Sequence, residues 1–327
     1  MHPFEYERPT KLQEASNLRQ GKSGSEFIAG GTTLLDLMKL NVSSPRLLVD
    51  INQIGLNKIE RRGNSTFIGA LVSNSDLAHA SLITEEFPLL SEAVLSGASA
   101  QLRNMATVGG NIMQRTRCYY FRDPSMPCNK REPGSGCPAI EGFNRMHAVL
   151  GGSDNCIATH GSDMCVALLA LDALLHLEGP DGKRTVQLED FHLLPGDTPH
   201  VETILKPGEI ITEVELPDRP FAKRSTYLKV RDRASYAFSL SSVAVALELH
   251  ADIIKSCRVA FGGIATKPWR SKEAEKILTG HSANKDLFQQ AASAALAGAV
   301  GQTYNSFKIE LTKRTLLRAL EKAGAIA

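Results

Sequence analysis

The hydrophobic pattern of the first fifty residues predicts a small α/β unit. The apolar run at 27–29 is typical of a short strand, and the glycine pair at 30–31 predicts a turn after it. Apolar residues then recur at helical spacing over 34–40, which predicts a helix, and 47–51 has the composition of a buried strand.

A second unit follows, with a strand at 66–70 and helices around 75–80 and 88–98. Its pattern then breaks, and 118–156 has little periodicity. An irregular segment of this length inside a compact domain is usually functional or disordered. Because the segment carries four cysteines, the sequence favours a function.

Two further apolar stretches follow this segment. Residues 164–177 are strongly apolar and are compatible with either a helix or a strand. Residues 210–216 alternate between apolar and polar positions, which predicts an edge strand ending at Pro217.

A third unit is expected from about Arg224. Its antiparallel strands are predicted at 227–230, 241–249 and 257–262. Residues 271–321 have a mostly helical pattern. Since strands and helices do not alternate strictly, the sequence predicts the α+β class rather than a doubly wound sheet.

The composition is that of a globular protein that needs neither disulfides nor metal to hold its fold. With 327 residues, 43% hydrophobic and 22% charged, the chain can form two or three packed modules. A net charge of +2 gives no argument for nucleic acid as a partner, and no apolar stretch is long enough to span a membrane. Lacking a signal-peptide pattern, the protein is expected in the cytoplasm, or in the periplasm only if exported with a signal-bearing partner.

Four of the six cysteines are the candidate metal ligands. Cys118, Cys128, Cys137 and Cys156 have the spacing C-x9-C-x8-C-x18-C. Without a signal peptide, metal binding is favoured over disulfides. The spacing matches neither ferredoxins nor zinc ribbons, so Zn²⁺ and a [4Fe–4S] cluster both remain open.

Local charge bears on the kind of metal centre, and the other cysteines and the nearby histidines bear on the choice of ligands. Residues 101–150 hold seven basic against three acidic residues, an excess that favours a net-negative cluster. Cys165 and Cys257 lie in apolar patterns and are expected to be buried structural cysteines. His147 and His160 are the less favoured rival ligands.

Two glycine turns are the candidate phosphate-binding elements. Residues 29–34 place two glycines and two threonines at a strand-to-helix turn, where backbone N–H groups can converge on an anion. Residues 106–111 again combine a glycine pair with threonine and asparagine donors. The two turns could clamp a diphosphate, or could be unrelated. Neither is a Rossmann fingerprint or a P-loop.

Together with 259–263, the segments 27–32 and 103–111 resemble the FAD-binding subunits of the xanthine dehydrogenase and carbon monoxide dehydrogenase family. The resemblance covers essentially the whole chain. It implies two FAD-binding subdomains like those of vanillyl-alcohol oxidase, at 1–57 and 58–222 with an iron–sulfur insertion at about 114–158, and a C-terminal α/β domain at 223–327.

By this resemblance, the first turn wraps the pyrophosphate and the second faces it. It also implies that Asp163 lies near the ribose and phosphates. Ile211 and Lys229 would lie near the isoalloxazine, where the lysine ammonium would stabilise reduced flavin. Gly97 departs from relatives that carry an aromatic there. The implied flavin site is Phe27, Ile28, Ala29, Gly30, Gly31, Thr32, Thr33, Leu34, Thr107, Gly110, Asn111, Thr116, Asp163, Ile211 and Lys229.

The cysteine segment resembles the flavin subunit of bacterial aldehyde oxidoreductases of the periplasmic type, which carries a [4Fe–4S] cluster in this loop. The flavin subunit of 4-hydroxybenzoyl-CoA reductase has a comparable insertion with a different spacing. The resemblance therefore implies that Cys118, Cys128, Cys137 and Cys156 bind a [4Fe–4S] cluster.

The implied function is electron transfer, with no catalytic acid, base or nucleophile in this chain. A large partner with a molybdenum cofactor would oxidise an aldehyde, and a small partner with [2Fe–2S] clusters would reduce the FAD. FAD would pass electrons to a small-molecule or protein acceptor. The alternatives are a flavin subunit of a 4-hydroxybenzoyl-CoA reductase-like or xanthine dehydrogenase-like complex, and a non-enzymatic binding module with a four-cysteine zinc site.

Overall fold

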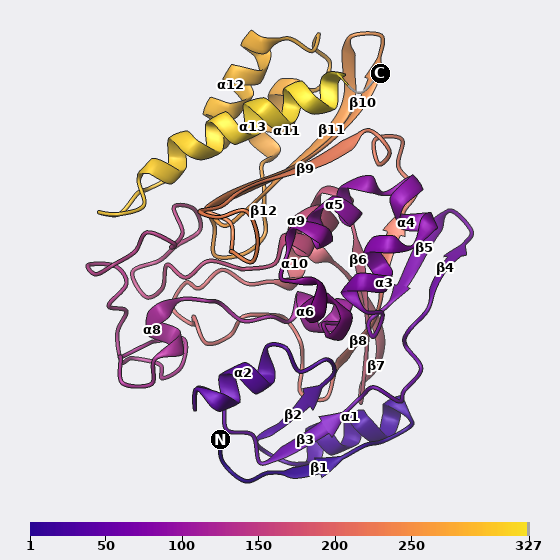
Figure 1. Ribbon diagram of the computed structural model, residues 1–327, viewed down its shortest axis with the longest axis vertical. Coiled ribbons are helices and arrows are strands. Elements are labelled where there is room, and N and C mark those ends of the chain that lie inside the picture. The colour runs from indigo at the N-terminus through magenta and orange to yellow at the C-terminus, as the bar shows by residue number, and fades with distance from the viewer. Residues whose placement is uncertain (326–327) are drawn as a thin grey trace.

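The computed structural model describes residues 1–325 and contains three sheets with helices packed on them (Figure 1). The first sheet is parallel, with strand order β1-β3-β2. Its central strand β3 is buried throughout because both neighbours pair with it and α1 covers it. This part consists of β1 Glu5–Glu7, α1 Leu12–Gly21, β2 Ser25–Ile28, α2 Leu34–Lys39 and β3 Leu47–Asp50.

The second sheet is antiparallel, with order β4-β5-β8-β6-β7. Residues 164–177 form both a helix and a strand, because Asp172 adopts a left-handed turn (φ 53°) between them. This part consists of β4 Ile59–Arg62, β5 Ser65–Gly69, α3 Asn74–His79, α4 Ser81–Glu86, α5 Pro88–Ser96, α6 Ala100–Met105, α7 Val108–Ile112, α8 Tyr119–Arg122, α9 Asp163–Ala170, β6 Leu174–Gly179, β7 Gly182–Gln187, α10 Leu188–Phe191 and β8 Ile210–Pro217.

The prediction of an edge strand at 210–216 was wrong. Strand β8 lies at the centre of its sheet, paired with β5 on one side and β6 on the other. Its burial nevertheless alternates from Thr212 to Pro217, because one face of the sheet is covered more than the other. Alternation therefore reports the covering of the faces, and it does not separate an edge from a centre.

The third sheet, β12-β11-β10-β9, is antiparallel and lies between two helical layers (Figure 1). Helix α13 covers one side, and α5 and α9 pack on the other, so residues 241–247 of β10 are all buried. This part consists of β9 Ser225–Val230, β10 Ser241–His250, β11 Ile253–Gly262, β12 Trp269–Arg270, α11 Lys272–Leu278, α12 Lys285–Ala295 and α13 Phe307–Ala325.

The α+β class is confirmed, and the boundaries at 57/58 and 222/223 stay a prediction. Between 114 and 158, the structure contains one helix, the four-residue α8, and the rest of the segment is irregular, as its sequence pattern indicated. Among residues 1–325, no helix combines the length and apolarity needed to cross a membrane.

One carboxylate joins the second sheet to the third. Asp172 accepts hydrogen bonds from Arg258 on β11 at 2.8 Å and from Arg270 on β12 at 2.6 Å. Burial by itself would raise the pKa of Asp172, but the two guanidinium groups outweigh burial and lower the pKa below its ordinary value of 3.8. The ionised carboxylate is therefore a stabilising contact between the sheets.

We predict that Asp172→Asn lowers the free energy of unfolding by about 3 kcal/mol, because Arg258 loses its counter-ion and Arg270 keeps only Glu275. Asparagine tolerates the left-handed backbone, so the substitution isolates the charge. Since the folded pKa is lowered, the contribution is present above the unfolded pKa and is lost as pH falls through the folded one. Denaturant unfolding at pH 7 and near pH 3 measures this; an equal difference at both pH values would contradict it.

Candidate functional site

A cavity of about 460 Å³ contains most of the predicted flavin residues on its wall. All of 27–34 line it, together with Thr107, Gly110 and Ile211. Further walls come from 192–205, a segment that sequence reasoning did not assign to the site. The volume lies within the range of cavities that bind small molecules and cofactors.

The first glycine turn presents free donors to this cavity. The backbone N–H groups of residues 30–33 donate no hydrogen bond to any residue within 1–325. Gly31 has φ +69°, a conformation that glycine adopts without steric cost. Residues 30–33 are half-buried on the cavity wall, so their N–H groups are open to the anionic oxygens of a bound molecule.

The second glycine turn touches the first. A Cβ atom on Gly30 would lie 1.7 Å from the carbonyl oxygen of Met105, so only glycine permits this approach. The amides of the second turn are already used, since Val108 N donates to Val72 O at 3.0 Å and Gly109 N to Ala70 O at 2.8 Å. This turn therefore supports the first and offers the Thr107 hydroxyl rather than a second set of amides.

Two predicted contact residues lie off the cavity wall with their side chains engaged elsewhere. Asn111 accepts a hydrogen bond from Ser162 Oγ at 2.6 Å. Thr116 donates to Thr159 O at 2.8 Å, which fixes the start of the cysteine segment. A direct contact of either residue with flavin stays a prediction.

Asp163 and Lys229 also lie off the cavity wall and form a buried ion pair. Lys229 Nζ is 2.8 Å from Asp163 Oδ2, and its side chain is 4% exposed although β9 is an edge strand. The hydroxyl of Tyr227 donates to Asp163 at 2.6 Å. Burial and the neighbouring carboxylate raise the pKa of Tyr227 well above its usual value, so this hydroxyl keeps its proton. Flavin contact by this pair stays a prediction.

The structure explains the departure at Gly97. A Cβ there would lie 3.2 Å from Asp163 Oδ2, closer than an ordinary contact. The space that a side chain would need is taken by the Asp163–Lys229 pair, and Lys229 also donates to Ser96 O at 3.1 Å.

The four cysteines of the irregular segment gather around one small cavity. Cys118, Cys128, Cys137 and Cys156 all line it, and none forms a disulfide. Within residues 1–325, no three of these sulfurs lie within 4.8 Å of one another. Tetrahedral zinc holds its sulfurs about 3.8 Å apart, since each Zn–S bond is about 2.3 Å. Any three of the four sulfurs therefore include a pair that lies farther apart than a tetrahedral zinc site would hold them.

Burial keeps three of these thiols protonated when no metal is bound. It raises the pKa of Cys118 to about 12 and also raises the pKa values of Cys137 and Cys156. A metal centre would displace the protons, because coordination deprotonates a thiol outright. Four thiols without disulfide partners, two buried and two half-buried, are therefore consistent with a site for soft metal ions.

Helix α2 anchors the cysteine segment to the first glycine turn. Its Asp36 pairs with Arg117 at 2.6 Å and with Arg122 at 2.7 Å. On the same helix, Leu37 packs in an apolar cluster with Phe121 and Cys128. The helix that leaves the glycine turn thus also supports the four thiols.

The two cavities share a wall. Lys130, Cys156 and Ala158 line both of them. Lys130 is held in place by donating to Pro199 O at 2.9 Å, and its charge opposes the rise in the pKa of Cys156. A group held by the thiols and one held in the larger cavity would therefore be neighbours.

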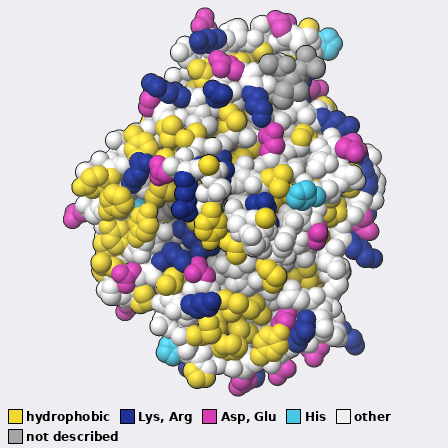
Figure 2. Space-filling model, viewed as in Figure 1, with side chains coloured by type: hydrophobic (Ala, Val, Ile, Leu, Met, Phe, Trp, Pro, Cys, Tyr) yellow, Lys and Arg dark blue, Asp and Glu magenta, His cyan; other side chains and the backbone are white. Residues whose placement is uncertain are grey.

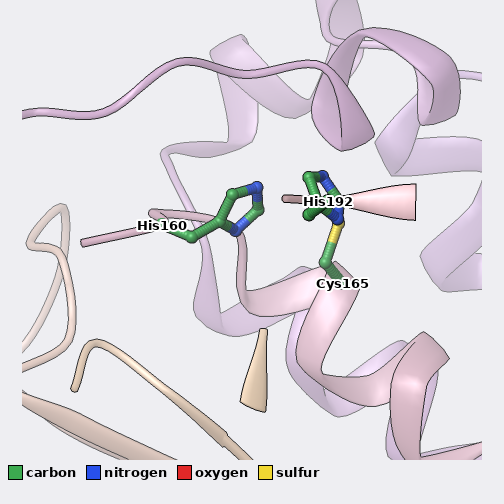
Figure 3. Close-up of side chains that lie close together, drawn as sticks. All are labelled: His160, Cys165 and His192. Atoms are coloured by element: carbon green, nitrogen blue, oxygen red, sulfur yellow. The ribbon is translucent and has the colours of Figure 1, made fainter. Parts of the chain in front are cut away.

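A third cluster, drawn in Figure 3, brings together His160, Cys165 and His192, whose possible ligand atoms lie within 4.8 Å of one another. His192 Nε2 lies 3.0 Å from Ile112 O, which fixes its proton there and leaves Nδ1 as an acceptor. His160 Nδ1 accepts from Ser162 N at 3.3 Å, which places its proton on Nε2. One free acceptor and one free donor do not make a metal site, and burial raises the pKa of Cys165 to about 12.

The two histidines considered as rival ligands therefore lie at different sites. His160 packs edge-on against the ring of His192, with centroids 4.5 Å apart, on the wall of the larger cavity. His147 instead lies against the cysteine site, with Nε2 3.1 Å from Cys118 Sγ. Cys165 and Cys257 are buried in α9 and β11, as expected.

Two family models match the chain. Residues 2–219 match the model described as the FAD binding domain in molybdopterin dehydrogenase. Residues 226–323 match the model described as the CO dehydrogenase flavoprotein C-terminal domain. The second match begins within β9, so it covers the third sheet and its helices.

Relatives and solved structures agree with these matches. The chain is 49% identical to the aldehyde oxidoreductase FAD-binding subunit PaoB of Escherichia coli, over 100% of both chains. It is 31% identical to the glyceraldehyde dehydrogenase medium chain of Sulfolobus acidocaldarius, over 90% of this chain and 88% of that one. Its fold superimposes with a TM-score of 0.78 on carbon monoxide dehydrogenase from Hydrogenophaga pseudoflava, at 27% identity over 99% and 98% of the two chains.

These full-length matches agree with the geometry of the glycine turns. Free amide donors, a cavity of cofactor size and an FAD-binding family model all concern the same residues. The chain belongs to the FAD-binding subunits of the molybdenum hydroxylase family, and it is a subunit of an FAD-dependent oxidoreductase.

Proposed function

We propose that this chain is the electron-transfer subunit of a molybdenum-dependent aldehyde oxidoreductase and binds a [4Fe–4S] cluster beside its FAD. The observation that carries the proposal is the shared wall, in which Cys156 and Lys130 line both the four-thiol cavity and the larger one. Electron transfer between two cofactors needs short separation, and a common wall provides it.

For the flavin, the chain supplies binding and orientation. The free amides of 30–33 would receive the diphosphate, with the Thr107 hydroxyl beside them. Bound FAD supplies the conversion between two-electron and one-electron transfer. Ile211 and the 192–205 segment would exclude water from the rest of the cofactor.

For the cluster, Cys118, Cys128, Cys137 and Cys156 are the proposed ligands. Their burial and their spacing, wider than a zinc site needs, support an iron–sulfur cube. Helix α2 would hold the cluster loop at a fixed position relative to the flavin turn, through Asp36 and its two arginines.

The substrate class is proposed from relatives. The Escherichia coli relative is named as an aldehyde oxidoreductase subunit and the Sulfolobus relative as a glyceraldehyde dehydrogenase chain. The oxidised substrate would be selected by the partner that carries the molybdenum cofactor. A small partner with [2Fe–2S] clusters would deliver the electrons, and a small molecule or protein would accept them.

An apolar surface near the cysteine segment supports assembly with partners. Figure 2 shows hydrophobic side chains gathered on the side of the molecule where α8 lies. Tyr119, Phe143 and Tyr304 are each at least half exposed there, and their rings stack in a row with centroids 6.2 and 5.7 Å apart. Exposed contiguous apolar patches commonly mark protein–protein interfaces.

The test is the metal and flavin content of the purified complex. We expect about four irons above those of the [2Fe–2S] partner, and one FAD, per copy of this chain. One zinc with no flavin would replace the proposal by a non-enzymatic zinc module. Activity with purines or an aromatic CoA thioester, and none with aldehydes, would assign the complex to a different substrate class.

We predict that Cys128→Ser removes the [4Fe–4S] absorption and about four irons while flavin stays bound, because a serine oxygen is a poor ligand for iron–sulfur clusters. Cys257→Ala is the matched control, since Cys257 is equally buried but lies in β11 away from the four thiols. Unchanged iron in Cys128→Ser would show that the ligand set is wrong.

We predict that Gly30→Ala lowers the flavin content at least about tenfold, which requires a loss of only about 1.4 kcal/mol of binding free energy. The added Cβ would meet Met105 O at 1.7 Å and separate the two turns. In Gly21→Ala, where nothing lies within 4 Å of the added Cβ, flavin content should not change. Flavin released from the desalted protein by acid and quantified by fluorescence measures both; equal flavin in the two variants would refute the role of this contact.

A further inference from the structure

One histidine contacts the proposed cluster site directly. His147 Nε2 lies 3.1 Å from Cys118 Sγ, and the side chain is 1% exposed. Within residues 1–325, it is the only side chain that forms a hydrogen bond to any of the four thiols. Backbone N–H groups also interact with the thiols, among them Ala158 N at 3.5 Å from Cys156 Sγ and those of Tyr120 and Phe121 at Cys118.

The direction of this hydrogen bond follows from the chemistry of the two atoms. A metal-bound thiolate has no proton and can only accept. His147 Nδ1 is buried and has no partner, so the ring makes its single side-chain hydrogen bond through Nε2. The ring nitrogen that faces Cys118 is therefore the one that carries the proton.

The backbone of His147 is fixed by the C-terminal helix α13 and the loop before it. Its carbonyl accepts from Lys308 Nζ at 2.9 Å and from Asn305 Nδ2 at 3.3 Å. Lys308 is fully buried, and its second hydrogen bond goes to Gly263 O. His147 N donates to Asn144 O at 2.9 Å. The donor is thus held against the sulfur by contacts from a distant part of the chain.

We propose that His147 sets the reduction potential of the [4Fe–4S] cluster by donating its Nε2–H to the sulfur of Cys118. One electron that enters the cluster adds one negative charge, which spreads over irons and sulfurs. A hydrogen bond to a ligand sulfur stabilises that added charge and raises the potential. The inference rests on the proposed function, because it requires the cluster. His147 is a positioning residue that touches a ligand and is not itself a ligand.

The experiment compares His147→Leu and His147→Gln in the assembled complex by redox titration followed by EPR. Leucine removes the donor without leaving an unpaired polar group, and glutamine can still donate an N–H. We expect full iron and flavin in both. Poised at the wild-type midpoint, the ratio of reduced to oxidised cluster should fall about tenfold in the leucine variant, equivalent to about 59 mV for one electron. Glutamine should recover most of this.

A control variant separates this effect from the general loss of a histidine. His176→Leu replaces a half-buried histidine that contacts Glu215 and Thr185 on the second sheet, so the potential should not change. Full iron with a wild-type potential in His147→Leu would overturn the inference and leave the cluster in place. A wild-type complex without the additional four irons would overturn the proposed function itself.

A measurement on the unmutated protein covers the case in which the leucine variant fails to assemble. With ¹⁵N-histidine label, pulsed EPR of the reduced cluster should show one weakly coupled histidine nitrogen. A strong coupling would make His147 a ligand, and no coupling would remove the hydrogen bond; either result overturns the inference.

Discussion

The approach of Gly30 to the carbonyl of Met105 is the contact on which the site depends. No side chain fits between them, so the first glycine turn lies directly on the second and its amides are left free toward the cavity. Helix α2 leaves this turn and carries Asp36, which binds two arginines of the cysteine segment. A single run of contacts therefore fixes the position of the thiols relative to the first glycine turn.

Local chemistry could be predicted from sequence where it depends on neighbouring residues. The glycine turn at 29–34 needs only its own backbone, and the strands and helices of the third unit follow from their periodicity. What depends on distant contacts could not be predicted. Examples are the central place of β8, the inward turn of Lys229 toward Asp163, and the 192–205 wall, which has no motif.

Counting charges along the chain proved a weak argument for the cluster. The basic excess of 101–150 is largely neutralised by acids outside that window: Asp36 pairs with two of the arginines, Glu202 with Arg115 at 2.6 Å, and Asp232 with Arg145 at 2.7 Å. What distinguishes the cysteine site is its geometry, with four buried or half-buried thiols around one cavity and a neutral imidazole beside them.

The buried Lys308 shows why this insertion requires the rest of the chain. Burying an ammonium is costly, and burial lowers the pKa of Lys308 to about 7. The cost is offset by two carbonyls, one from His147 in the insertion and one from Gly263 after β11. An irregular loop cannot hold a hydrogen-bond donor against a sulfur by itself, because it has no regular backbone pairing. The C-terminal helix supplies the missing rigidity, so the cysteine segment and α13 form one functional element although His147 and Lys308 are 161 positions apart in sequence.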